Sequence, residues 1–118
     1  MDTDRPADTT APLPAEPEGF SADGAAVLRR LDDAGRYELD LDGRTVAHAT
    51  FLRLGDDVIM IPHTEVDLSR RGQGIGALLV AAVLDDLRRR GERVVPRCWY
   101  VAQYLDEHPE HLDLVANI

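Results

Sequence analysis

The amino-acid sequence predicts a mixed α/β domain with a mostly antiparallel sheet and a central strand-helix-strand unit. Apolar and polar residues alternate between Arg36 and Val66 in segments separated by short turns, which is the two-residue period of half-buried strands. Apolar residues then recur at helical spacing from Ile75 to Leu87, and a β-branched and aromatic segment follows. A strand, a helix and a strand in this order predict a right-handed parallel crossover.

The first part of the chain differs from the rest in composition. Residues 1–19 are rich in Pro, Thr and acidic residues and have no apolar periodicity, so we expect a disordered arm that buries too little surface to order itself. Residues 20–118 are expected to form a single domain, because domains are usually about 100–150 residues long. Residues 25–28 fit either a short helix or an edge strand.

Three strands are expected next. The first, residues 36–41, ends at Asp42 and Gly43, a pair that supplies the positive φ angles of a tight hairpin. The second spans residues 44 to about 54. The third spans residues 58–66, and its first four residues are apolar on both faces, so it is expected to be a central strand.

A helix is expected from Ile75, with Asp85, Asp86 and Arg88 opposite its apolar face. Its three final arginines, residues 88–90, suit the negative end of the helix dipole, and Gly91 is the expected C-cap. A fourth strand is expected from Arg93 to about Tyr100, with Trp99 in the core or in the wall of a pocket. A short helix then covers residues 101–108.

Composition excludes several classes of partner and site. The formal net charge of −9 argues against nucleic acid or an anionic membrane as a partner, because both require a basic face. It favours a partner that is an amine or another cation. The single cysteine, Cys98, allows no internal disulfide and no multi-cysteine zinc site. His108 and His111 lack a third converging ligand, so no metal is expected. No secretory signal or apolar run of about 20 residues is present, which predicts a cytoplasmic protein.

A glycine-rich turn, residues 72–76, leads directly into the expected helix. Such a turn presents unpaired backbone N–H groups at the positive end of the helix dipole, where phosphate binds. A nucleotide-triphosphate loop is excluded, because Ala77 and Leu78 follow where Lys and Ser or Thr are needed. The dinucleotide fingerprint also fails, because its third glycine is missing at Ala77.

The spacing of Arg71-Gly72-Gln73-Gly74-Ile75-Gly76 resembles the Arg/Gln-x-x-Gly-x-Gly/Ala signature of the GNAT acetyltransferase superfamily. Together with His63-Thr64-Glu65-Val66, Cys98-Trp99-Tyr100 and Tyr104, it is similar to a compact subfamily of YjdJ-like or NATD-like proteins. The resemblance covers about residues 36–115. It implies a GNAT-like sheet whose third and fourth strands splay apart, and an N-acetyltransferase that uses acetyl-coenzyme A.

The resemblance also implies where the coenzyme binds. The backbone amides of the glycine loop would hold the diphosphate, nearby arginines would add charge, and the pantetheine arm would lie between the splayed strands. The expected coenzyme-binding residues are Thr64, Val66, Arg70, Arg71, Gly72, Gln73, Gly74, Ile75 and Gly76.

Four residues are candidates for the chemistry. His63 and Glu65 lie on the same side of the third strand and either one could accept the amine proton; alternatively, Glu65 caps the glycine loop and His63 is structural. Cys98 is a buried apolar residue, a nucleophile or a proton donor to the leaving sulfur. Tyr104 matches the family's proton-donating tyrosine, with Tyr100 as a substitute, and could equally be the apolar face of a short helix.

The sequence does not identify the amine that would accept the acetyl group. GNAT enzymes build their acceptor site from helices between the first two strands, and too few residues precede Arg36 to supply them. Three interpretations follow: a large or macromolecular amine binds an open face, a second subunit of a homodimer completes the pocket, or catalysis is lost and the chain is a coenzyme A-binding or sensing module.

Overall fold

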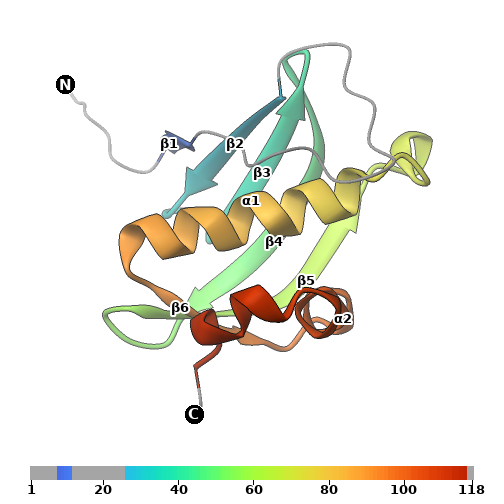
Figure 1. The fold of residues 1–118 in the computed structure, drawn as a ribbon. Helices are drawn as coiled ribbons and strands as arrows, with labels where there is room; N and C mark the ends of the chain where they lie inside the picture. Colours follow the sequence, from blue (N-terminus) through green and yellow to red (C-terminus); the bar gives the residue numbers. More distant parts are fainter. Residues whose placement is uncertain (1–7, 12–25, 117–118) are drawn as a thin grey trace, which may run out of the picture.

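A six-stranded sheet in the order β1-β2-β3-β4-β5-β6 forms the framework of the computed structural model (Figure 1), which describes residues 8–11 and 26–116. The strands β1 to β5 pair antiparallel with their neighbours, whereas β5 and β6 are parallel and joined by α1. The elements are β1 Asp8–Ala11, β2 Ala26–Leu31, β3 Arg36–Leu41, β4 Arg44–Arg53, β5 Val58–Val66, the 3-10 helix η1 Leu68–Arg70, α1 Ile75–Arg90, β6 Arg93–Pro96, α2 Trp99–Glu107 and the 3-10 helix η2 Pro109–Leu114. The predicted fold class is therefore confirmed.

The start of the chain differs from its prediction. Four residues of the expected disordered arm form β1, which pairs with β2 at the edge of the sheet. The rest of that arm, residues 1–7 and 12–19, lies outside the described residues. For the segment that the sequence left open, the structure selects the strand, β2, whose Leu28 packs into the core.

The β3–β4 hairpin and β5 follow the sequence closely. Asp42 and Gly43 have φ angles of 53° and 79°, as a tight hairpin turn requires, and strand β5 covers all of residues 58–66. β5 is paired on both sides, but only over its first half, because the ladder to β6 ends at the pair Ile61 and Pro96. The predicted splay of the two parallel strands begins at this pair.

The prediction for residues 93–100 was wrong at its end, because strand β6 stops at Pro96 and α2 already begins at Trp99. Neither Pro62 nor Pro96 has an N–H to continue the ladder. The carbonyl of Ile61 instead accepts hydrogen bonds from both Arg97 and Cys98, at 3.1 and 2.9 Å, which turns the chain into the helix. Cys98 is therefore the N-cap of α2 and not a strand residue.

The helix α1 lies across one face of the sheet and supplies much of the core (Figure 1). Its apolar side chains, among them Leu78, Leu79 and Val83, are almost completely buried, and Val101 and Leu105 of α2 join the same cluster. Of the helices in residues 8–11 and 26–116, none has both the length and the apolar character needed to cross a membrane.

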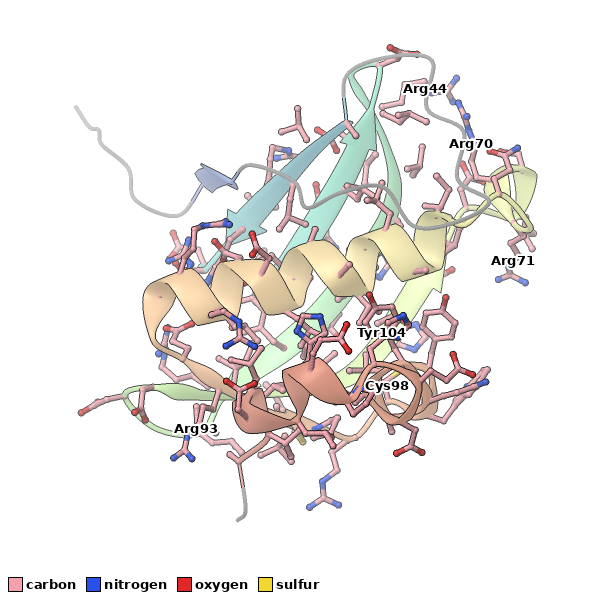
Figure 2. The ribbon with its side chains drawn as sticks, viewed as in Figure 1. Arg44, Arg70, Arg71, Arg93, Cys98 and Tyr104 are labelled. Atoms are coloured by element: carbon pink, nitrogen blue, oxygen red, sulfur yellow. The ribbon has the colours of Figure 1, made fainter. Side chains whose placement is uncertain are left out.

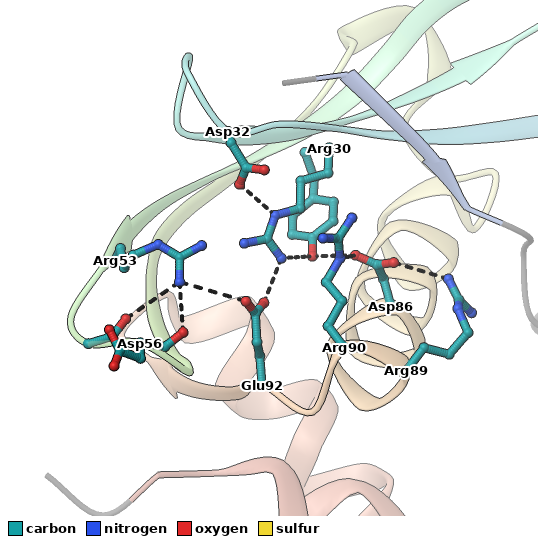
Figure 3. A network of polar contacts seen from close by, with 10 residues as sticks. Arg30, Asp32, Arg53, Asp56, Asp86, Arg89, Arg90 and Glu92 are labelled. Atoms are coloured by element: carbon teal, nitrogen blue, oxygen red, sulfur yellow. Dashed lines mark hydrogen bonds and ion pairs between the residues drawn. The ribbon is translucent and has the colours of Figure 1, made fainter. Parts of the chain in front are cut away.

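Asp86 was predicted on the solvent side of α1, but it is buried with 4% of its surface exposed. Its carboxylate accepts a hydrogen bond from the Tyr37 hydroxyl at 2.7 Å and pairs with Arg90 at 2.7 Å (Figure 3). Arg30, 1% exposed, donates to the same hydroxyl at 3.0 Å and to Glu92 at 2.6 Å. Polar partners from three elements thus converge on one buried cluster, which the helical periodicity alone does not indicate.

Candidate functional site

A cavity of about 850 Å³ opens where β5 and β6 part. Its walls come from three segments: residues 62–66 at the end of β5, residues 70–76 around the start of α1, and residues 97–100 at the start of α2. Gln73 is absent from the wall. The volume lies within the range of about 300–1,000 Å³ typical of small-molecule sites.

The glycine loop forms the part of the cavity that suits an anion. Gly72 and Gly74 have φ angles of 84° and 78°, a region that side chains with a Cβ rarely occupy. No side chain caps α1 at Gly74, so the N–H groups of its first turn are available to a ligand at the positive end of the helix dipole. A Cβ added to Gly72 would meet open space, which shows that its neighbourhood is free for another molecule.

Three arginines line the cavity at which this helix starts. Arg70 and Arg71 project from the segment that precedes α1 (Figure 2), and Arg97 lines the same cavity. The Arg71 Nε atom donates to the carbonyl of Val66 at 3.4 Å, which leaves its other guanidinium nitrogens available. Within a chain of net charge −9, this local concentration of positive charge favours an anionic ligand.

Gly76 brings the helix start and α2 into contact. A Cβ at this position would lie 2.8 Å from the Tyr100 hydroxyl oxygen, so only glycine allows the tyrosine ring to approach α1 this closely. Burial raises the pKa of Tyr100, with Glu107 adding to the effect. The hydroxyl therefore stays protonated at neutral pH, and Tyr100 is one of the residues that line the cavity.

Tyr104, the residue that matches the family's tyrosine by sequence, is not in the cavity wall. Its ring stacks on His108 with 3.9 Å between centroids, and its carbonyl oxygen lies 2.9 Å from His108 Nδ1. Burial is the main cause that raises its pKa as well. The helix α2 begins at Trp99, two residues earlier than predicted, and this earlier start places Tyr100 instead of Tyr104 at the cavity.

Cys98 lies at the floor between the splayed strands, and its side chain is 7% exposed. Its sulfur is 3.5 Å from the Thr64 hydroxyl of β5. Burial alone would raise the pKa of the thiol, but hydrogen bonding from Thr64 and from the N–H groups of Val101 and Tyr100 outweighs it, so the pKa is lowered.

His63 and Glu65 lie on the free end of β5, as the alternation of strand side chains predicts, and both are exposed. The His63 Nε2 atom is 3.5 Å from Glu65 Oε1. The Nε2 atom of His48, on β4, is 3.9 Å from the same carboxylate oxygen. The Glu65 carboxylate therefore lies close to two imidazoles, of which only His63 also lines the cavity.

Sequence reasoning missed Pro62 and Arg97 as wall residues, and of the two alternatives for Trp99 the structure selects the cavity wall. The indole is 73% exposed, so it belongs to the rim of the cavity and not to the core. Two prolines, one in each parallel strand, were the available signal for the end of the ladder and hence for the position of the cavity.

A mixed sheet with a parallel crossover and a glycine-rich helix start beside splayed strands defines an α/β protein with a cavity at an uncapped helix start. The family model of the GCN5-related N-acetyl-transferases matches residues 36–114, more than half of the chain, and the protein belongs to this family. The predicted membership of the GNAT superfamily is confirmed.

Several known proteins are similar to parts of the chain. Protein NATD1 of Gallus gallus is 34% identical over 64 residues, which are 50% of this chain and 58% of that protein. Protein NATD1 of Homo sapiens is 34% identical over 56 residues, 48% of this chain and 50% of that protein. The chain thus spans about half the length of the curated relatives it matches. The solution NMR structure of a GCN5-like candidate N-acetyltransferase from Staphylococcus aureus shares the fold, with a TM-score of 0.55, 22% identity, and coverage of 71% of this chain and 83% of that one.

Proposed function

We propose that the protein is an N-acetyltransferase that moves the acetyl group of acetyl-coenzyme A to an amine. The observation that carries the proposal is the cavity at the splay of β5 and β6, which contains an uncapped helix start beside a thiol and two exposed proton acceptors. Eleven of the thirteen residues expected from the sequence line it; Gln73 and Tyr104 do not.

In this proposal the coenzyme lies across the cavity with its diphosphate at the glycine loop. The N–H groups of residues 72–76 donate to the phosphate oxygens, and Arg70 and Arg71 supply positive charge. The pantetheine arm runs along the free edge of β5, where residues 64–66 have no β6 partner and offer backbone groups for its amides. Such an arrangement places the thioester near Cys98 and the mouth of the cavity.

The transfer requires one proton to leave and one to arrive. The acceptor nitrogen attacks the thioester carbonyl, the C–N bond forms, the C–S bond breaks, and the thiolate of coenzyme A takes up a proton. Glu65 or His63 accepts the proton of the attacking amine directly or through water. Cys98, Tyr100 or Tyr104 supplies the proton to the leaving sulfur, and the cavity contacts favour Tyr100 and Cys98 over Tyr104.

The acceptor is proposed to approach from the cavity mouth, where Glu65 and the exposed Trp99 are accessible. Described residues before Arg36 form β1 and β2 and no helix, so they contribute no helical acceptor pocket. A macromolecular amine or a second subunit could complete the site. The same observation favours a second function, a module that binds or senses coenzyme A without turnover.

Thermal stabilisation by ligands tests the proposed site. Coenzyme A is expected to raise the melting temperature more than dephospho-coenzyme A, NAD or ATP at equal concentration, because a ligand that binds only the folded state stabilises it by mass action. Equal shifts with all four compounds, or no shift with coenzyme A, would contradict the proposal.

A turnover assay distinguishes the N-acetyltransferase from the coenzyme A-binding module. Release of free thiol from acetyl-coenzyme A in the presence of a panel of small amines and amine-bearing proteins is expected for the enzyme. Clear stabilisation by coenzyme A without thiol release on any acceptor would instead support the binding module.

A further inference from the structure

We propose that His48, His63 and Glu65 form a binding site for Zn²⁺ on the sheet face opposite α1. These three side chains form a group of potential metal ligands within residues 8–11 and 26–116, with all of their ligand atoms within 4.8 Å of one another. The sequence predicted no metal, because His108 and His111 lack a third converging ligand.

The register of the sheet brings the three residues to one face. His48 on β4 is directly opposite Glu65 on β5, and cross-strand partners point to the same side of a sheet. His63 lies two residues before Glu65 and therefore shares that side. Ala47 and Ala49, the neighbours of His48, are buried in the core on the α1 side, which confirms that the imidazole points away from the helix.

The distances suit a small divalent ion. Ligand bonds of about 2.0–2.2 Å in a tetrahedral site require ligand atoms about 3.3–3.6 Å apart. The Glu65 Oε1 atom is 3.5 Å from His63 Nε2 and 3.9 Å from His48 Nε2. Both contacts are longer than strong hydrogen bonds, so a modest side-chain adjustment would bring all three atoms to an ion between them.

The ligand set selects the type of metal. Two imidazoles and a carboxylate suit Zn²⁺ and related transition metals, whereas Mg²⁺ and Ca²⁺ prefer oxygen ligands throughout. Glu38, which faces His48 from β3, pairs with Arg29 and with Arg36 and is therefore engaged elsewhere. With three protein ligands, the fourth position falls to water or to a bound molecule.

The site overlaps the cavity mouth. His63 and Glu65 are the proposed proton acceptors, so a bound ion would occupy the lone pairs that they need for that role. Inhibition of acetyl transfer by Zn²⁺ would follow, and this consequence rests on the proposed function. Metal binding itself does not, so the test measures binding and remains informative even if no acetyl transfer is found.

Titration of the tag-free protein with Co²⁺, followed by competition with Zn²⁺, tests the site. Co²⁺ is expected to give visible absorption bands that Zn²⁺ removes. His48→Gln and Glu65→Gln should each weaken binding at least about tenfold, because even groups that only support metal ligands are worth ~10- to 100-fold. His111→Gln is the matched control, since this histidine lies in η2 outside the cluster, and it should bind as the parent does.

Equal affinity of the parent protein, His48→Gln and Glu65→Gln would overturn the site. So would Co²⁺ bands with strong near-ultraviolet sulfur absorption that vanish in Cys98→Ala, because the metal would then be held by the thiolate. Far-ultraviolet circular dichroism of each variant establishes that its fold is intact before binding is compared.

Discussion

The two ends of α1 are built in opposite ways. At the C-terminal end, Arg88, Arg89 and Arg90 each pair with a carboxylate, and the N–H of Gly91 closes the last turn. At the N-terminal end, Gly74 supplies no side-chain cap, and the helix start faces a cavity of about 850 Å³.

The difference separates stability from binding. A buried charge is tolerated when it is paired and hydrogen-bonded, as Arg30 and Asp86 are near the C-terminal end (Figure 3). Helix N–H groups without a cap are instead satisfied by water or a ligand. We therefore expect substitutions at the C-terminal end to change folding stability, and those at the N-terminal end to change ligand affinity.

The largest expected effect is on stability, from Asp86→Ala. The change leaves the Tyr37 hydroxyl without its acceptor and removes the partner of Arg90, so the free energy of unfolding should fall by about 3–5 kcal/mol, as for a broken buried ion pair. Asp85→Ala is the matched control, because this neighbour is 39% exposed and pairs with Arg89, and it should cost at most about 1 kcal/mol. Urea denaturation followed by circular dichroism measures both, and equal losses would refute the distinction.

A loss of affinity is expected at the other end, from Gly74→Val. The side chain would cover the helix start and block two or more charge-assisted hydrogen bonds, which should weaken coenzyme A binding at least about 100-fold in calorimetry. Gly43→Val controls for backbone strain, because Gly43 has a φ angle of 79° against 78° for Gly74 and lies in the β3–β4 hairpin. If both variants bind coenzyme A equally well, the glycine loop is not the diphosphate site.

The smallest expected effect is on the pH at which the Cys98 thiol reacts. Because its thiol pKa is lowered, alkylation by iodoacetamide should reach half of its maximal rate at a lower pH in the folded protein than in urea. Thr64→Val removes the strongest hydrogen bond that favours the thiolate, so its midpoint should move to higher pH. The lowered pKa of the thiol also contributes to the free energy of unfolding. It stabilises the folded state at pH values above the pKa of the thiol in the unfolded chain, and this contribution is lost as the pH falls through the pKa of the folded state. An unchanged midpoint in Thr64→Val would exclude this role of the hydroxyl.

Local signals made part of the fold predictable. The Asp42-Gly43 turn, the apolar start of β5 and Gly91 each depend on a few neighbouring residues, and the structure contains all three features. Residues 97–100 were misassigned, because the aromatic Trp99 and Tyr100 favour a strand and only the separation of β5 from β6 lets α2 begin at Trp99. Asp86 was misplaced because its burial depends on Tyr37, a distant residue.

In the site, too, features that depend on neighbouring residues were predictable, whereas those that depend on tertiary contacts were not. The glycine loop is a continuous motif, so its place at the helix start could be predicted from spacing alone. The choice between Tyr100 and Tyr104 depends on where α2 begins, and the approach of His48 to Glu65 depends on strand register. Both are tertiary properties that one sequence does not reveal.

Backbone amide spectra during a coenzyme A titration test the central claim most directly. In ¹H–¹⁵N correlation spectra, the amides of Gly72, Gly74, Ile75 and Gly76 should show the largest shifts, because they would donate to the diphosphate. The amides of Gly43 and Gly91, which also have positive φ angles but lie outside the cavity wall, should stay in place. Unchanged amides at residues 72–76 with saturating coenzyme A would contradict the account.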